Sequence, residues 1–246
     1  MKRPGNTPGR SCTAMSTIHL IGGEKGGVGK SVVARLLCQY FIDHEMGFTA
    51  LDADGSHGAL LRHYAAYTQP VDLARFESAD EIMKLALDTD CRVLVDLPAQ
   101  SERALAAWMA ESGILELATE TGVRVVFWHV MDGGKDSLNT LERLLERHRA
   151  AAHYCIVKNL GRSKDFTLFD HSPSRARAES LNAKILELPE LNEVAMQKVD
   201  RLDASFWAAV HNEAAGDAGL TRMDRQRVKV WVQACSDRFA RVADTL

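Results

Sequence analysis

A glycine-rich turn between a short apolar stretch and a helical pattern constrains the fold of this chain more than any other feature. The segment Ile18–Ser31 reads IHLIGGEKGGVGKS, and apolar residues recur after it at helical spacing. Gly26, Gly27 and Gly29 allow backbone conformations that residues with a Cβ atom avoid, so their amides can point at phosphate oxygens. The N-terminus of the following helix adds a partial positive charge. The segment therefore predicts a phosphate-binding loop.

Two side chains at the end of this loop suit a nucleotide that carries a divalent cation. Lys30 can reach the β- and γ-phosphates, and the Ser31 hydroxyl can bind Mg²⁺. The general pattern G-x-x-x-x-G-K-[ST] has a glycine where this chain has Glu24, and a second lysine, Lys25, follows. We expect the loop residues that contact the nucleotide to be Gly26, Gly27, Val28, Gly29, Lys30, Ser31 and Val32.

Acidic residues end two further apolar segments. Asp52 and Asp54 end the predicted strand Phe48–Asp54, and Asp96 lies near the end of the predicted strand Cys91–Pro98. The carboxyl ends of parallel strands lie beside the ligand in sheets of this kind. We therefore expect Asp96 to hold Mg²⁺ through water and the two other carboxylates to lie nearby. A purely structural Asp-x-Asp at a strand end is the alternative.

Apolar segments alternate with helical patterns along the whole chain. The apolar segments are nearly continuous, which is typical of a parallel sheet covered on both faces. We predict an α/β fold with a doubly wound, mostly parallel sheet and helices on both faces. One domain would span residues 17–246, after a flexible polar tail at residues 1–16. The predicted strands are Ile18–Gly22, Phe48–Asp54, Cys91–Pro98, Val123–Met131, Tyr154–Asn159 and Lys184–Leu188.

The C-terminal stretch Leu220–Leu246 has a long helical pattern with an apolar side and a locally basic side. The chain as a whole has 30 basic and 33 acidic residues, so DNA binding would need a local patch of this kind. A packed terminal helix with a solvated face is the plainer interpretation. The alternative DNA-contacting residues are Arg222, Arg225, Arg227 and Lys229.

Apolar runs in this chain are far shorter than the roughly 20 residues that cross a bilayer. The N-terminal residues also lack the apolar stretch of a secretory signal. We therefore expect a cytoplasmic protein without membrane contact, associated with the nucleoid if it binds DNA.

The run Lys25–Ser31 resembles the deviant phosphate loop of the ParA/MinD family, within the SIMIBI group of P-loop NTPases. This family also includes the nitrogenase iron protein and arsenical-pump-type ATPases. The resemblance extends over nearly the whole chain from Ser16 onward. It implies a homodimer formed with ATP and Mg²⁺, in which Lys25 reaches the nucleotide of the other subunit.

The same resemblance implies roles for four further residues. Asp54 matches the aspartate that orients the attacking water, and Asp52 matches one near the Mg²⁺ region. Asn159, at the end of a predicted strand, matches an asparagine that hydrogen-bonds adenine, and Pro189 would flank the base. The sequence after Asn159 lacks the guanine-binding aspartate, which favours ATP over GTP.

Within the family, the chain is most similar to the TraL/StbB-type ATPases of plasmid conjugation and maintenance. The shared features are Gln39-Tyr40, Gly133-Gly134 and the late basic run Arg225–Lys229. The resemblance implies a slow Mg²⁺-dependent ATPase that acts as a nucleotide-gated dimerisation switch. Its output would be DNA or plasmid partition, positioning or conjugative transfer, with a protein cargo or adaptor as partner.

Two other functions fit the same loop. A nucleotide-dependent adaptor would recruit other proteins and hydrolyse little ATP. An ATP-dependent metabolic ligase would need a second pocket with substrate-specific polar groups, and the sequence offers no clear residues for one.

Overall fold

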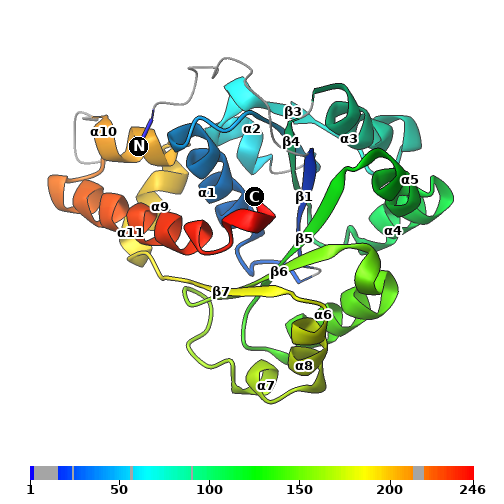
Figure 1. The fold of residues 1–246 in the computed structure, drawn as a ribbon. Coiled ribbons are helices and arrows are strands. Elements are labelled where there is room, and N and C mark those ends of the chain that lie inside the picture. Colours follow the sequence, from blue (N-terminus) through cyan, green and yellow to red (C-terminus); the bar gives the residue numbers. More distant parts are fainter. Residues whose placement is uncertain (3–15, 24, 56–57, 90, 213–218) are drawn as a thin grey trace.

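Parallel strands form a seven-stranded sheet in the order β3-β2-β4-β1-β5-β6-β7 (Figure 1), and all six neighbouring pairs run parallel. This computed structural model describes residues 1–2, 16–23, 25–55, 58–89, 91–212 and 219–246. The predicted fold class is confirmed. The strands are β1 (Thr17–Gly22), β2 (Phe48–Asp52), β3 (Thr68–Pro70), β4 (Arg92–Asp96), β5 (Arg124–Met131), β6 (His153–Asn159) and β7 (Lys184–Leu188).

Two predicted strands end earlier in the structure than in the sequence prediction, and β5 begins one residue later, at Arg124. β2 ends at Asp52 and β4 ends at Asp96, so the residues that follow each of them form loops at the carboxyl edge of the sheet. The three-residue edge strand β3 was not predicted, because it is too short for an alternating pattern and ends in Pro70. These differences leave the sheet order intact and place the acidic residues at its edge.

Helices cover both faces of the sheet (Figure 1) because successive strand residues point to opposite sides. In β1, Ile18 and Leu20 belong to one hydrophobic core and Ile21 belongs to the other. The α-helices are α1 (Lys30–Asp43), α2 (Ala59–His63), α3 (Phe76–Thr89), α4 (Glu102–Glu111), α5 (Ile114–Thr121), α6 (Lys135–His148), α7 (Thr167–Asp170), α8 (Pro173–Ser180), α9 (Glu193–Arg201), α10 (Phe206–His211) and α11 (Arg222–Ala240).

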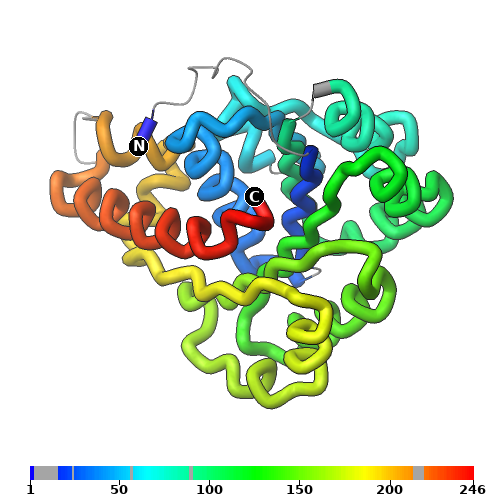
Figure 2. The backbone as a smooth tube through the Cα atoms, in the orientation of Figure 1, coloured from blue at the N-terminus to red at the C-terminus, as the bar shows by residue number. Residues whose placement is uncertain are grey.

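The core on one face joins α1 to the last three helices, although they lie far apart in the sequence. Figure 2 shows the red C-terminal segment running beside the blue segment that follows the phosphate loop. The apolar side predicted for the C-terminal stretch is buried in this core, which confirms a packed terminal helix. Its buried members are Val228, Val232, Cys235, Phe239 and Val242.

The predicted tail falls largely outside the described residues, since residues 3–15 are among those not described. Ser16 is buried, and its hydroxyl donates to the carbonyl of Ala86 in α3 at 2.7 Å, so this residue packs against that helix. The flexible tail and the single domain over 17–246 stay predictions. In the part of the chain that is described, no helix is long and apolar enough to cross a membrane.

The start of α11 is fixed by a buried carboxylate. Asp224 and Thr221 form a capping box, and Asp224 also pairs with Lys198 of α9 at 2.6 Å and with Arg227 at 3.1 Å. The hydrogen bond from Lys198 and those from Thr221 lower the Asp224 pKa to about 2. The ionised carboxylate therefore ties α9 to α11.

We expect Asp224→Asn to lower the free energy of unfolding by about 2 kcal/mol at pH 7, from the difference between the folded and unfolded pKa values. A lowered folded pKa contributes stability above the unfolded value of about 4, and this contribution is lost as the pH falls toward 2. Urea unfolding of both proteins between pH 7 and pH 3 measures this. Asp237→Asn, at an exposed position of the same helix, is the control and should change stability little. If the difference in free energy of unfolding between the wild-type protein and Asp224→Asn does not decrease below pH 4, the lowered pKa of Asp224 is contradicted.

Candidate functional site

The phosphate loop leaves β1 and enters α1 through a glycine with a left-handed backbone. Gly29 is the N-cap of α1 and has a φ of 103°. A Cβ atom at this position would lie 2.3 Å from Nδ2 of Asn159, so no larger residue fits without displacing that side chain. The loop therefore takes its shape because glycine stands where the chain turns into the helix.

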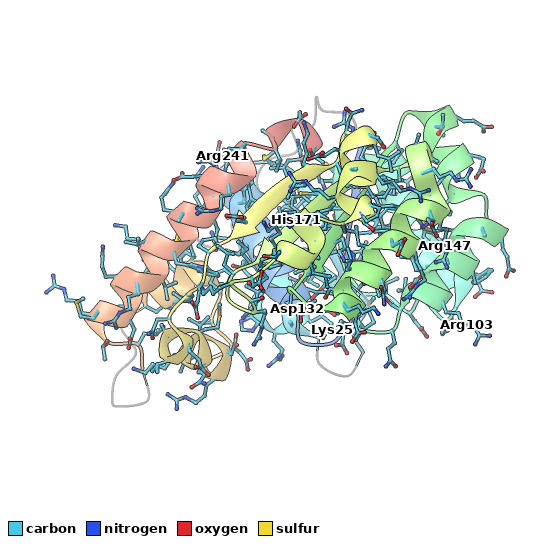
Figure 3. The ribbon with its side chains drawn as sticks, turned by 90° about the horizontal axis from the view of Figure 1, so that it is seen from below. Lys25, Arg103, Asp132, Arg147, His171 and Arg241 are labelled. Atoms are coloured by element: carbon cyan, nitrogen blue, oxygen red, sulfur yellow. The ribbon has the colours of Figure 1, made fainter. Side chains whose placement is uncertain are left out.

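Lys30 and Lys25 lie close together in the loop but have different surroundings. Lys30 is buried, and its ammonium group donates to the carbonyl oxygen of Lys25 at 3.0 Å. The side chain of Lys25 is 38% exposed, and its Nζ lies 2.7 Å from Oδ2 of Asp132. Figure 3 labels both residues. This hydrogen bond raises the pKa of Lys25. The loop thus carries one inward and one outward ammonium group.

Asp132 is a site residue that sequence reasoning missed. Its Oδ1 accepts hydrogen bonds from the amide of Gly134 at 3.0 Å and from the hydroxyl of Ser137 at 2.7 Å. These bonds hold the carboxylate at the end of β5, beside the loop. The available signal was its place directly before Gly133-Gly134, a pair already noted in the sequence.

A cavity of about 380 Å³ brings the predicted phosphate and metal residues together from separate segments of the chain. This phosphate cavity also receives Arg35, Arg62 and Arg162, which carry positive charge that would suit phosphate groups. Asp54 is half-buried at its wall. The predicted residues that line it are Gly26, Gly27, Gly29, Lys30, Ser31, Val32, Asp54 and Asp96.

Asp96 has the environment of a cation ligand. It is buried, and no hydrogen bond reaches either of its carboxylate oxygens within the described part of the chain. Burial raises its pKa to about 7, with Ser31 and Lys30 opposing the shift and Asp52 adding to it. A buried carboxylate beside a hydroxyl is the oxygen donor set that Mg²⁺ prefers, usually together with phosphate oxygens. Asp96 and Ser31 therefore fit a nucleotide-bound Mg²⁺.

Asp52 lies opposite Asp96 in the register of β2 and β4, and its carboxylate is bound by backbone amides. Its Oδ2 accepts from the amides of Leu60 at 2.8 Å and Leu61 at 3.2 Å, and its Oδ1 accepts from the amide of Asp54 at 3.0 Å. The carboxylate thus caps α2 and shapes the segment that carries Asp54. Asp52 does not line the phosphate cavity, and its place near Mg²⁺ stays a prediction.

A second cavity, of about 460 Å³, lies on the other side of Gly29 and contains both predicted base-contacting residues. Pro189 is held there by a hydrogen bond from Nε1 of Trp231 to its carbonyl at 2.7 Å. Asn159 donates from Nδ2 to the carbonyl of Val28 at 2.7 Å and accepts from the amide of Gly161 at 3.0 Å. Asn159 therefore braces the loop from within this base cavity, and its contact with adenine stays a prediction.

A buried arginine network at the phosphate cavity had no sequence signal, because its members come from three distant helices. Arg35 of α1 donates to Nε2 of His63 at 2.9 Å and to Oδ1 of Asp200 at 2.8 Å. Burial, together with the charge of Arg35, lowers the His63 pKa to about 4. His63 is therefore neutral near pH 7, and its Nδ1 can donate to the carbonyl of Ala204 at 2.9 Å.

The predicted DNA-contacting residues at α11 differ in their exposure and in their contacts within the chain. Arg227 pairs with Asp224, and Arg225 is half-buried and donates to the carbonyl of Asn212 at 3.4 Å. Arg222 and Lys229 are exposed. The patch therefore presents less free positive charge than its sequence suggests.

Two curated proteins are similar in sequence to most of this chain. The chain is 25% identical over 232 residues to the protein TraL of Escherichia coli, which covers 88% of this chain and 94% of TraL. It is 25% identical over 222 residues to the protein MobD of Acidithiobacillus ferrooxidans, covering 87% and 96%. No family model matches.

Among solved structures, the fold is similar to the septum site-determining protein MinD of Pyrococcus horikoshii, which was solved with Mg-ADP. The TM-score is 0.50 at 14% identity, and the match covers 86% of this chain and 93% of MinD. This likeness concerns the fold.

We expect Asp96→Asn to stabilise the nucleotide-free protein at pH 8 and to weaken the stabilisation that Mg²⁺ with ATP provides. A carboxyl group whose pKa is raised to about 7 in the folded state destabilises the protein when it ionises. This destabilisation is absent below about pH 4 and reaches its full size above pH 7. The increase in the free energy of unfolding that Asp96→Asn produces should therefore grow between pH 4 and pH 7, to at least about 1 kcal/mol. Chemical unfolding at several pH values measures it, and a gain that is independent of pH would contradict this environment.

Proposed function

Because the chain is a P-loop NTPase of the ParA/MinD type, we propose that it is a Mg²⁺-dependent ATPase whose nucleotide state controls the pairing of two copies. The observation that carries the proposal is the position of Lys25. It lies in the phosphate loop and its side chain remains partly exposed, while Lys30 is directed into the same loop. An outward lysine at this place can contribute to the nucleotide of a second subunit.

Hydrolysis would depend on position and charge. Lys30 and the loop amides would hold the phosphates, and Ser31 and Asp96 would hold Mg²⁺. The bound ion would neutralise charge that develops on the transferred phosphoryl group. Asp54, at the wall of the phosphate cavity, would orient the attacking water. Turnover would be slow, because such a protein uses its nucleotide state as a switch.

Dimer formation would require Lys25 to exchange its partner. In the single chain its ammonium group is held by Asp132, whose other oxygen is already occupied by Gly134 and Ser137. The phosphate oxygens of a nucleotide bound to the second subunit would offer a stronger negative charge to the same ammonium group. The ion pair would keep Lys25 oriented until ATP brings the two copies together.

The biological role that we propose is partition, positioning or conjugative transfer of plasmid DNA in the cytoplasm. The similarity to TraL and MobD supports this role, since the TraL/StbB-type ATPases that the sequence resembles serve plasmid conjugation and maintenance. A nucleotide-dependent adaptor is the second candidate. It is favoured by Met223 and Val230, which are each 59% exposed among the basic residues of α11, a mixture that suits contact with a protein.

We expect Lys30→Ala to abolish ATP binding, because it removes the inward ammonium group. Asp54→Ala should bind ATP with Mg²⁺, form a dimer and hydrolyse little, whereas Lys25→Ala should bind ATP and remain monomeric. Isothermal titration, light scattering and phosphate release measure the three properties. Normal hydrolysis by Asp54→Ala would remove its proposed role, and an ATP-dependent dimer of Lys25→Ala would remove the role of Lys25.

We expect Asp54→Ala to bind arbitrary duplex DNA with ATP and Mg²⁺ but not with ADP or without nucleotide. Fluorescence anisotropy at two salt concentrations measures this, and binding should weaken steeply with salt because it depends on phosphate contacts. A variant with Arg222 and Lys229 replaced by Gln should lose binding, whereas Arg103→Gln serves as the control on the distant helix α4 (Figure 3). Absence of DNA binding in every state, with ATP bound, would favour the adaptor.

A further inference from the structure

The base cavity and the phosphate cavity meet at a boundary formed by few residues. Both cavities are lined by Gly29, Val32, Arg162 and Asp200. A nucleotide has its ribose and its α-phosphate between the base and the outer phosphates. A nucleotide that fills both cavities must therefore place its ribose and α-phosphate at this boundary.

Two of these four boundary residues have polar side chains, and their charges are opposite. An ionised carboxylate only accepts hydrogen bonds and repels phosphate, so it suits a hydroxyl group. A guanidinium group donates to phosphate oxygens with favourable geometry. We propose that Asp200 accepts hydrogen bonds from the ribose hydroxyls, that Arg162 contacts the α-phosphate, and that the site consequently prefers ribonucleotides to deoxyribonucleotides. The inference rests on the proposed function, because it takes the two cavities as one nucleotide site.

The carboxylate of Asp200 is held in place before any ligand binds. Its Oδ1 accepts from Arg35, whose side chain is only 4% exposed. Arg35 in turn is bonded to His63 and lies over the ring of Phe206, with 5.2 Å between Cζ and the ring centroid. The side chain of Asp200 nevertheless remains 52% exposed. An acceptor that is already oriented loses little conformational freedom when it binds a hydroxyl.

Other acidic residues of the two cavities are less suited to the ribose. Glu190 and Glu193 line the base cavity alone, and they are bonded to Lys164 at 2.5 Å and to Gln197 at 3.1 Å. Asp54 and Asp96 line the phosphate cavity alone. A carboxylate at the ribose hydroxyls is also how dinucleotide-binding sites recognise an unmodified ribose.

Arg162 is carried by a turn that Asn159 organises. The amide of Arg162 donates to the carbonyl of Asn159 at 3.0 Å, and the amide of Gly161 donates to the Asn159 side chain at 3.0 Å. The Arg162 side chain is exposed at the boundary. Asn159 thus positions the phosphate loop on one side and Arg162 on the other.

Isothermal titration of the full chain with Mg²⁺ and either ATP, 2′-deoxyATP or 3′-deoxyATP tests the proposal. The wild-type protein should bind ATP roughly tenfold to hundredfold more tightly than at least one deoxy analogue, the range expected for a hydrogen bond to a charged group. Asp200→Ala should bring this ratio close to one. Arg162→Gln should weaken ATP and both analogues alike and leave the ratio unchanged.

Asp203→Ala is the matched control. Asp203 has nearly the same exposure, 51% against 52%, and pairs with Arg62, but it lines neither cavity, so the ratio should stay at the wild-type value. Asp200→Asn retains an acceptor for Arg35 and should reduce the ratio without loss of folding, which circular dichroism verifies.

Equal affinity of the wild-type protein for ATP and both deoxy analogues would overturn this inference while leaving the proposed function intact. An unchanged ratio in a folded Asp200→Ala protein would also overturn it. Absence of ATP binding by the wild-type protein would instead overturn the proposed function on which the inference rests.

Discussion

The hydrogen bond from the Asn159 side chain to the carbonyl of Val28 is the contact on which the site depends. It joins the end of β6 to the phosphate loop across the sheet, at 2.7 Å. Gly29 leaves just enough room for it, since a Cβ atom would collide with the same amide. Both cavities border Gly29, so the contact sets the shape of the wall that they share. A loop defined by its glycines is therefore completed by a residue about 130 positions later.

The segment that follows β2 is fixed by a second group of contacts, which begins at Asp52. Because Asp52 caps α2, the position of Asp54 depends on where that helix starts. The same helix is bonded at its other end, where Arg62 pairs with Asp203 and His63 reaches the carbonyl of Ala204. A movement of Asp54 toward a γ-phosphate would therefore displace α2 and, through its contacts, the segment between α9 and α10.

Local sequence patterns could predict those parts of the molecule that depend on neighbouring residues. The phosphate loop, the order of long strands and helices along the chain, and the place of Asp96 at a strand end follow from glycine content, apolar periodicity and an acid after an apolar run. The pairing of Lys25 with Asp132 and the bonds of Asp52 could not be predicted. They depend on which segments the sheet brings together, and no spacing in the chain encodes that.

The site holds both basic and acidic side chains, and this combination suits a phosphate anion together with its metal cation better than either ion alone. Lys30 and Arg35 are buried beside Asp96, whose carboxylate oxygens have no hydrogen-bond partner among the described residues and whose pKa is raised by burial to about 7. Phosphate alone would bring further negative charge toward that carboxylate, and a cation alone would meet the buried ammonium and guanidinium groups. A nucleotide carrying Mg²⁺ would satisfy both sides at once, because the basic groups suit its phosphates and the carboxylate of Asp96 suits the metal. The cost of burying Asp96 without a partner is then offset in the bound state, which couples occupancy of the site to the stability of the fold around it.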